Sequence, residues 1–325
     1  MGKKFKVLIP EPEWEESHSI LEEIAEVKVG EVDKVYDENL LIDEIRDVDA
    51  IIITSQHHIT RKVIEKGEKL KVVVKYGSKP GTDNVDYEAA SEKGILICYT
   101  PGANSDSVAE HTIGLILALL KNLCTNHFRL RRAEWRDTNL LGYELLGKTV
   151  GIVGLGSVGC KVAEKLRGFG VELLAYTKAQ ENAKRVGATL VDLNTLLTKS
   201  DIVTVHTGLR DDTYHLIGEE ELKLMKKSAI IINTARGAII NEKALIKALK
   251  KGWITGAGLD VFKEEPIRPD SPLLWLDNVI LSPHSASFTY EAFRREAFTA
   301  AEEVLRVFQG KKPLFIANPK VIPKS

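Results

Sequence analysis

A glycine-rich turn lies near the centre of the chain, between an apolar segment and an amphipathic one. Residues 149–153 are apolar, and Gly154, Gly156 and Gly159 follow with the spacing GxGxxG. Between a strand and a helix, such glycines allow a tight turn, a close approach of the backbone to a pyrophosphate, and close packing of helix on strand. The helix N-terminus offers free N–H groups and the positive end of its dipole to the phosphates. We therefore predict a dinucleotide site that includes Gly154, Gly156, Ser157, Val158 and Gly159.

Side chains that could act on a bound ligand follow later apolar segments. Arg236 comes directly after the segment SAIIINTA, at a position where α/β sheets bind ligands. His284 lies in the turn Ser-Pro-His-Ser after the segment NVILS, which is typical of an exposed loop. Glu265 stands in a charged run beside Glu264, and by itself would be interpreted as a solvated charge. A guanidinium can bind a carboxylate through two hydrogen bonds, and a histidine can transfer protons near neutral pH.

The segments that position these residues alternate between apolar runs and amphipathic stretches. In the first part we expect strands at 4–10, 27–29, 50–54, 71–77 and 95–99, and helices at 14–25, 38–46, after 60 and at 86–93. Continuous apolar runs, rather than strict alternation, indicate strands buried on both faces of a parallel sheet. An almost wholly apolar helix should then run from Asn104 or Ser105, its N-cap, to about Leu120 and be buried.

The second part repeats the alternation. After the glycine motif we expect six further strands, at 171–177, 188–191, 201–207, 228–235, 254–262 and 278–282, and a last helix at 289–309. The pattern predicts an α/β fold with two doubly wound parallel-sheet domains, one Rossmann-type dinucleotide-binding and one smaller flavodoxin-like substrate domain. The last helix can return to the first domain, so the predicted boundaries are 1–100 plus 290–325 for the substrate domain and 101–289 for the dinucleotide domain.

Residues 121–146 lack clear periodicity and mix arginines with Trp135 and Tyr143. We expect an extended arm. It is either a solvated basic loop or a dimer contact, because Trp, Tyr and Arg favour interfaces. We favour a homodimer.

The composition excludes several classes of protein. The chain has 325 residues, enough for about two domains, and 45 basic against 46 acidic residues, so nothing favours nucleic acid or an anionic membrane as a partner. The longest apolar run, 112–120, is shorter than the roughly 20 residues of a membrane span, and we see no signal peptide. Three scattered cysteines and histidines without ligand spacing predict free thiols in a reducing cytoplasm and no metal site.

Several segments, in order along nearly the whole chain, resemble the D-isomer-specific 2-hydroxyacid dehydrogenase family, which includes glyoxylate/hydroxypyruvate reductases and phosphoglycerate dehydrogenases. They are DNVDYEAASEKGI, NSDSVAEHTIGLILALL, NTARGAIINEKAL, GLDVFKEEP and LSPHSAS. The resemblance implies an oxidoreductase with Arg236, Glu265 and His284 as catalytic residues and Asp260 near the nicotinamide. Glu265 is preferred over Glu264 because the family's glutamate directly precedes the proline. Thr207 and Ala235 complete the predicted cofactor contacts.

Reduction of a 2-keto acid would use these residues as follows. Arg236 would hold the substrate carboxylate and polarise the keto oxygen. His284 would give a proton to the developing alkoxide, since an imidazole with an ordinary pKa of about 6.5 titrates near neutral pH. Glu265 would bind the other ring nitrogen and favour the protonated ring. His206, at the end of the segment DIVTVHT, would be structural or lie beside the cofactor.

The choice between NADP and NAD depends on the segment after VELLAYT. An NAD site normally has an acidic residue about 20 positions after the glycines, where it binds the ribose 2′-hydroxyl. Here Thr177 and Lys178 occupy that place. A threonine can donate to a 2′-phosphate and a lysine can neutralise it, so we predict NADPH; the alternative is a solvated Lys178 and use of both cofactors.

The predicted substrate depends on a segment of the first domain. The segment KYGSKPGTDNVD occupies the place of the family's substrate-binding loop, and we assign Gly77, Ser78 and Lys79 to it. Lys79 would bind a second anionic group or be solvated. Glyoxylate and hydroxypyruvate lead, because 54–57 lacks the arginines expected for phosphoglycerate and no regulatory domain follows the last helix. Phosphite oxidation, through Lys79, and a non-catalytic cofactor-sensing role like that of the family's corepressors are the alternatives.

Overall fold

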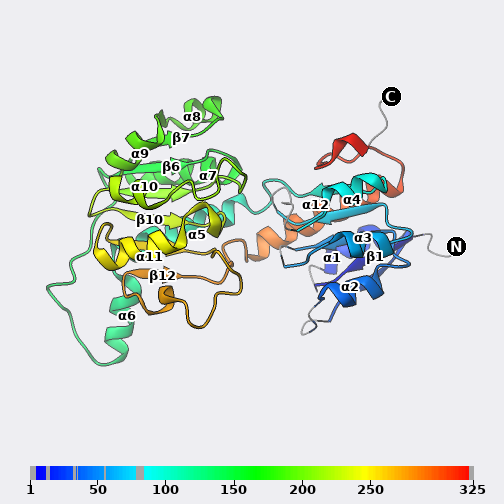
Figure 1. Cartoon of the computed structure of the whole chain (residues 1–325), viewed down its shortest axis with the longest axis horizontal. Coiled ribbons are helices and arrows are strands. Elements are labelled where there is room, and N and C mark those ends of the chain that lie inside the picture. Colours follow the sequence, from blue (N-terminus) through cyan, green and yellow to red (C-terminus); the bar gives the residue numbers. More distant parts are fainter. Residues whose placement is uncertain are drawn as a thin grey trace. The chain divides into compact units, whose positions relative to one another are not determined.

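The computed structural model describes residues 5–11, 15–31, 34, 36–54, 56–77 and 84–321. The chain splits into two compact units, each with its own sheet (Figure 1). Unit 1 comprises Met1–Asn104 and Thr289–Ser325, and unit 2 comprises Ser105–Phe288.

Unit 1 is built on a parallel five-stranded sheet with the order β2-β1-β3-β4-β5, a doubly wound order typical of flavodoxin-like folds. The inner strands β3 and β4 are buried at every position, which explains their continuous apolar sequences. The strands are β1 (Phe5–Ile9), β2 (Ala25–Val29), β3 (Ala50–Ile53), β4 (Val72–Lys75) and β5 (Leu96–Tyr99).

Helices cover both faces of this sheet. One face packs against α2 (Glu38–Glu44), α3 (Arg61–Lys66) and α4 (Tyr87–Glu92). The other face packs against α1 (Glu15–Glu22) and α12 (Tyr290–Phe308), whose alanine stripe allows close approach. A short 3-10 helix, η4 (Pro319–Val321), follows α12. The sequence prediction of one helix over 14–25 is partly wrong: α1 ends at Glu22, and the chain has already entered β2 at Ala25.

Unit 2 is built on a parallel seven-stranded sheet with the order β12-β11-β10-β9-β6-β7-β8. The strand before the glycine motif, β6, therefore lies inside the sheet, between β9 and β7, and the six strands predicted after it all join the same sheet. The strands are β6 (Thr149–Val153), β7 (Glu172–Tyr176), β8 (Thr189–Leu190), β9 (Ile202–Val205), β10 (Ile230–Asn233), β11 (Gly256–Leu259) and β12 (Val279–Leu281).

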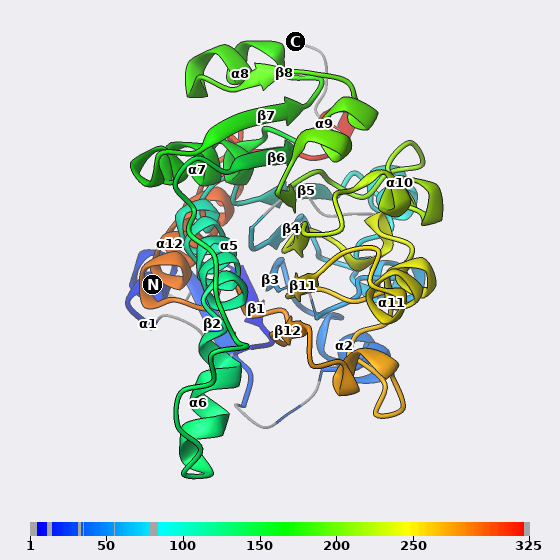
Figure 2. The ribbon, with the colours of Figure 1, turned by 90° about the vertical axis from the view of Figure 1, so that its left-hand side faces the viewer.

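Two layers of helices enclose the unit 2 sheet (Figure 2). One layer contains α9 (Leu193–Lys199), α10 (Glu219–Leu224) and α11 (Glu242–Lys251). The other contains α5 (Ser105–Leu120), α7 (Ser157–Leu166) and α8 (Gln180–Val186), and α5 is largely buried there, as its apolar sequence predicts. Three short 3-10 helices, η1 (Arg167–Phe169), η2 (Gly237–Ile239) and η3 (Pro272–Trp275), complete the unit.

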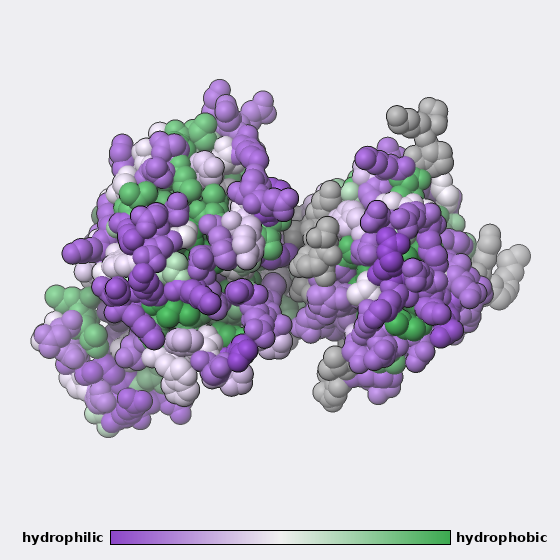
Figure 3. Space-filling view, in the orientation of Figure 1, coloured by the Kyte–Doolittle hydropathy of each residue, from purple (hydrophilic) through white to green (hydrophobic). Residues whose placement is uncertain are grey.

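The segment 121–146 is not wholly extended, which corrects the sequence prediction. It contains the helix α6 (Leu123–Arg131), which has no buried residue. Figure 3 shows hydrophobic side chains at the surface near α6 and the loop that follows it. Seven large apolar side chains of this segment are exposed: Leu123, Phe128, Leu130, Trp135, Leu141, Tyr143 and Leu146.

Within the described residues, no single helix is long and apolar enough to cross a membrane; only α5 and α6 taken together, bent by 62°, meet that criterion of length and composition. All three cysteines are free thiols, with Cys98 and Cys160 buried and Cys124 exposed.

Candidate active site

The glycine turn is closely packed on one side and open on the other. Gly154 has φ +98°, and a Cβ added there would lie 2.8 Å from the backbone of His206. A Cβ on Gly159 would overlap the carbonyl oxygen of Gly154, whereas a Cβ on Gly156 would meet nothing within 4 Å. Gly156 is the N-cap of α7, so no side chain caps the first turn, which begins with Ser157 and Val158. The turn therefore presents open space and backbone N–H groups at a helix N-terminus, as an anion site requires.

Thr177 and Lys178, at the end of β7, lie beside this turn. The Thr177 Oγ1 accepts hydrogen bonds from the N–H groups of Leu155, 3.3 Å away, and Ala179, 3.1 Å away. The Lys178 side chain is 84% exposed, and its Nζ lies 2.5 Å from a carboxylate oxygen of Asp212. Sequence reasoning missed Asp212 because it follows a different strand, β9.

His206 and Thr207 follow β9 on the other side of β6. The His206 ring is buried and its Nε2 contacts the Thr204 hydroxyl. Burial lowers the pKa of His206 to about 3, so the ring is neutral at physiological pH. The backbone of His206 and Thr207 packs against Gly154, which gives His206 a structural place under the glycine turn.

Arg236 follows β10 in a backbone conformation held by Asn233. The Asn233 amide donates to the carbonyl of Arg236 over 2.9 Å and accepts from the N–H of Ala235 over 3.0 Å. The half-buried Arg236 guanidinium donates to the carbonyl of Ala235 over 2.6 Å. A Cβ on Gly237 would overlap the carbonyl of Phe262, so only glycine lets this loop lie directly on the loop after β11.

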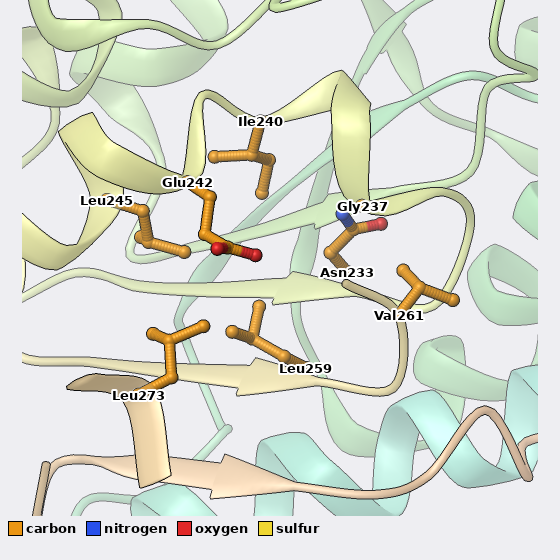
Figure 4. Close-up of a pocket in the computed structure, with 8 residues that line it drawn as sticks. All are labelled: Asn233, Gly237, Ile240, Glu242, Leu245, Leu259, Val261 and Leu273. Carbon is orange, nitrogen blue, oxygen red and sulfur yellow. The ribbon is translucent and has the colours of Figure 1, made fainter. Parts of the chain in front are cut away.

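The space under these two loops is too small for a substrate. Figure 4 shows a recess at the ends of β10 and β11, walled by Asn233 and Gly237 and by mostly apolar side chains. Its volume is about 10 Å³, the size of one water molecule. The Glu242 carboxylate, which also lines the recess, accepts the N–H of Lys263 over 3.1 Å. The recess is therefore part of the support for Arg236 and not a binding pocket.

Glu265 and His284 form a direct pair. The Glu265 Oε2 lies 2.6 Å from the His284 Nδ1, and the other carboxylate oxygen accepts the N–H of Phe262 over 2.9 Å. Burial by itself would raise the pKa of Glu265, but the bonds from His284 and Phe262 and the charges of His284 and Arg236 hold that pKa below its ordinary value. Both side chains are about one-third exposed, so the imidazole remains accessible.

Asp260 holds the loop that carries His284. The Asp260 side chain is 1% exposed and accepts bonds from the Ser282 hydroxyl over 2.6 Å and from the N–H groups of Ser285 and Ala286 over 2.9 Å each. Its own carbonyl accepts the N–H of His284 over 2.8 Å. Both carboxylate oxygens are engaged with this loop, so Asp260 fixes the position of His284; its place near the nicotinamide stays a prediction. The signal for this role was available: a buried carboxylate directly after a strand requires partners.

His111, from α5, is a second residue that sequence reasoning missed. Its Nε2 lies 2.8 Å from the Ser282 hydroxyl and 3.7 Å from a carboxylate oxygen of Asp260. The half-buried ring therefore joins the support of the His284 loop from the helix side. The sequence could not indicate this role because the two partners lie far apart along the chain.

The substrate residues predicted in unit 1 are only partly described. Gly77 has φ +79°, and its N–H donates to the Thr100 hydroxyl over 2.6 Å, so this amide is already engaged. Ser78 and Lys79 lie outside the described residues. In the part of the chain that is described, no group of three His, Cys, Asp or Glu side chains could hold a metal ion.

Arg236, Glu265 and His284 thus follow three neighbouring strands, β10, β11 and β12, at one edge of the unit 2 sheet. A guanidinium beside a carboxylate–imidazole pair can bind an anion and exchange a proton with it. The glycine turn follows β6 at the same, carboxyl-terminal edge, where open α/β sheets bind their ligands.

Two related proteins cover nearly the whole chain. The glyoxylate reductase of Thermococcus litoralis is 38% identical over 331 residues, which is 99% of each chain. The D-3-phosphoglycerate dehydrogenase of Methanocaldococcus jannaschii is 43% identical over 322 residues, and the match covers 98% of this chain but 60% of that protein.

Solved structures share the fold. A protein from Thermus thermophilus matches with a TM-score of 0.89 and 33% identity over 96% of this chain and 99% of that one. An acyclic imino acid reductase in complex with NADPH and D-Arg matches with a TM-score of 0.86 and 28% identity over 96% and 99% of the chains. An NAD-dependent formate dehydrogenase from Staphylococcus aureus, in complex with NAD, matches with a TM-score of 0.83 and 29% identity over 95% and 97%.

The family model that matches residues 113–286 is described as the NAD-binding domain of D-isomer specific 2-hydroxyacid dehydrogenases. The matched span begins within α5 and includes the glycine turn and the loops of Arg236, Glu265 and His284. With this match and the full-length similarity to the T. litoralis protein, the chain belongs to the D-isomer-specific 2-hydroxyacid dehydrogenase family.

Proposed function

We propose that this oxidoreductase reduces a small 2-keto acid to the D-2-hydroxy acid, and catalyses the reverse oxidation, with glyoxylate and hydroxypyruvate as its leading substrates. The observation that carries the proposal is the bond of 2.6 Å between the Glu265 carboxylate and the His284 Nδ1, at the sheet edge where Arg236 also lies. The names of relatives, among them the T. litoralis glyoxylate reductase, support this substrate class.

His284 acts as the proton donor of the reduction. Because the Nδ1 is bound to Glu265, the Nε2 is the nitrogen left to face a substrate oxygen. The bonds from His284 and Phe262 hold the pKa of Glu265 below its ordinary value, so Glu265 accepts the Nδ1–H and orients the ring to give a proton to the developing alkoxide. In the oxidation the neutral ring accepts the same proton from the substrate hydroxyl.

Arg236 binds the substrate carboxylate and polarises the carbonyl group. A guanidinium keeps its charge at every relevant pH and matches a carboxylate through two parallel hydrogen bonds. Its bond to the carbonyl of Ala235 engages one nitrogen of a group that carries several N–H donors, and it fixes the direction of the side chain.

The residues of unit 2 fit a nicotinamide dinucleotide, which supplies or accepts the hydride when bound. Open space at Gly156 and the N–H groups of Ser157 and Val158 suit the pyrophosphate. Thr177 and Lys178 suit the adenosine ribose. Thr207 and Ala235, the other predicted cofactor contacts, follow the neighbouring strands β9 and β10. We propose unit 2 as the dinucleotide domain and unit 1, with the loop from Gly77 to Lys79, as the substrate domain. We favour NADPH because Lys178 replaces the usual acidic residue.

We also propose a cytoplasmic homodimer. The three free thiols support a reducing compartment. The exposed apolar residues of 121–146 support a self-association surface, which includes a groove of about 230 Å³ beside Arg129, Leu130 and Trp135. Large exposed apolar patches on a soluble chain mark interfaces, and Trp and Arg are enriched there.

A substrate panel tests the proposed activity. Purified protein is mixed with NADH or NADPH and with glyoxylate, hydroxypyruvate, pyruvate or 3-phosphohydroxypyruvate, and the absorbance of the reduced nicotinamide is followed. We expect the highest kcat/KM with glyoxylate or hydroxypyruvate and a D-configured product wherever the product is chiral. Phosphite with the oxidised nucleotides is the matched oxidation assay. Turnover of phosphite alone, or nucleotide binding with no turnover of any compound, would contradict the proposal.

A further inference from the structure

Three charged side chains form a bridge between the loops that follow β7 and β9. The Lys178 Nζ lies 2.5 Å from one carboxylate oxygen of Asp212, and the Arg210 Nε lies 2.9 Å from the other. Lys178 comes from the β7 loop, whereas Arg210 and Asp212 come from the β9 loop. Hydrogen bonds from Lys178 and then from Arg210 lower the pKa of Asp212, so the cluster carries two positive charges and one negative charge.

This bridge lies beside the glycine turn. In the sheet β6 is flanked by β7 and β9, so the loops after these two strands stand on either side of the turn after β6. The Thr177 hydroxyl, one residue before Lys178, accepts the N–H of Leu155 in the turn. On the other side Gly154 packs against the backbone of His206 and Thr207, just before the loop of Arg210. In dinucleotide folds the adenosine ribose lies at the end of the strand after the glycine helix.

We infer that Asp212 sets the preference between the two nicotinamide dinucleotides. This inference rests on the proposed dinucleotide site. The acidic residue that normally ends β7 and binds the ribose 2′-hydroxyl is absent from the β7 loop. Asp212, from the β9 loop, brings a carboxylate to Lys178 in the β7 loop, and Lys178 and Arg210 hold it there.

The 2′-phosphate of NADPH and the Asp212 carboxylate compete for Lys178 and Arg210. This competition decides which of the two dinucleotides binds more tightly. A 2′-phosphate carries a charge of about −1.5 to −2 and forms charge-assisted hydrogen bonds with cations, so Lys178 and Arg210 attract it. To reach Lys178 and Arg210, the 2′-phosphate must displace the Asp212 carboxylate, which costs little because exposed ion pairs are weak. The displaced carboxylate nevertheless stays nearby and repels the phosphate. A ribose 2′-hydroxyl, in contrast, can donate to Asp212. Asp212 therefore favours NADH, and Lys178 and Arg210 favour NADPH.

Binding of nucleotide fragments tests this inference without turnover. Adenosine 2′,5′-bisphosphate and 5′-AMP differ only in the 2′-phosphate, and calorimetric titration gives a Kd for each. In Asp212→Asn, we expect the bisphosphate to bind about 5-fold more tightly or better, and 5′-AMP to bind no more tightly than in the wild type. In Arg210→Ala and in Lys178→Ala, the bisphosphate should bind several-fold more weakly.

Glu220→Gln is the matched control. Glu220 is an exposed partner of Lys223 in α10, with 2.7 Å between the Nζ and the carboxylate, so this variant changes the net charge as Asp212→Asn does. It should leave both Kd values unchanged. An Asp212→Asn variant whose ratio of the two Kd values equals that of the wild type overturns the inference, as does a shift of the same size in Glu220→Gln. Failure of the proposed function has a different signature: the wild type then binds neither fragment, or binds both and reduces no 2-keto acid.

Discussion

The histidine that we assign as proton donor adopts a backbone conformation that few non-glycine residues adopt. His284 has φ +50°, in the left-handed region. Such a conformation costs on the order of 1 kcal/mol or more and persists only where the surroundings enforce it. Here Asp260 enforces it, because its carboxylate binds the N–H groups of Ser285 and Ala286 and its carbonyl binds the N–H of His284. The strained turn directs the ring toward Glu265.

A second carboxyl group, Glu296 in α12, predicts a pH-dependent stability of unit 1. The side chain is 4% exposed, and burial raises its pKa to about 7, although the charges of Lys75 and Arg295 and a bond from Asn104 oppose the rise. The unfolded carboxyl has a pKa of about 4.3, so between about pH 4.3 and 7 the folded state holds a proton that the unfolded state has released. The free energy of unfolding attributable to Glu296 therefore falls as the pH rises through this window.

The variant Glu296→Gln should remove this dependence. From about pH 5 to pH 8, the wild type should lose up to about 3 kcal/mol of unfolding free energy more than the variant does. Urea unfolding at a series of pH values measures the difference. Glu302→Gln changes an exposed glutamate of the same helix and should follow the wild type. Parallel pH curves for wild type and Glu296→Gln would show that the carboxyl does not titrate in this range.

For single residues, the sequence indicated the reactive groups but not the residues that they contact. Glu265, rather than its neighbour Glu264, lies against His284, as the residue before the proline was expected to do. Asp260 was expected beside the nicotinamide, and Asp212 was not considered at all. The loop that Asp260 binds, and the Lys178 that binds Asp212, lie more than 20 residues away along the chain, so a single sequence does not identify these contacts.

Among the structural elements, the glycine turn contains one glycine needed for packing and one that leaves space for a ligand. An added methyl group should therefore have a different effect at each of them. Gly159→Ala places a methyl group on the carbonyl of Gly154, so it should destabilise unit 2 by about 1–3 kcal/mol. Gly156→Ala meets no atom of the protein within 4 Å and should leave the stability nearly unchanged. It should nevertheless weaken dinucleotide binding about 10-fold, because the methyl group occupies the space proposed for the pyrophosphate.

Thermal unfolding and a nucleotide titration of the two variants provide the test. Each variant is the control of the other, since both add one methyl group within the same turn. If Gly156→Ala binds the dinucleotide as tightly as the wild type does, the pyrophosphate does not occupy the open side of the turn.

The elements were predictable where burial imposes a pattern. Strands such as β3 and β10 are buried on both faces, so their apolar residues run without interruption and their positions could be predicted. The helix α6 has no buried residue, so no apolar periodicity marks it, and the sequence indicated an extended arm instead. The end of α1 was also predicted too late, because a turn of only two residues separates it from β2.

At the scale of the whole molecule, the segment 121–146 predicts the oligomeric state. The exposed fraction of Trp135 is 81%, and that of Trp275, in η3, is 79%. If 121–146 forms the dimer contact, Trp135→Asp should convert the dimer to a monomer, because a charge then replaces an exposed aromatic residue of this apolar surface. Trp275→Asp should remain dimeric. Sedimentation equilibrium measures both; a monomeric wild type, or a Trp135→Asp variant that stays dimeric, would exclude this interface.

We propose that His284, held by Glu265, protonates the substrate during hydride transfer. The most direct test is single-turnover and steady-state reduction of glyoxylate by His284→Asn, together with the Kd of the reduced nucleotide. Asparagine tolerates the left-handed backbone at this position but cannot titrate, so the loop should keep its conformation. We expect kcat to fall by about 10²–10⁴-fold with the nucleotide Kd within about 2-fold of the wild type. Unchanged turnover in this variant would contradict the assignment.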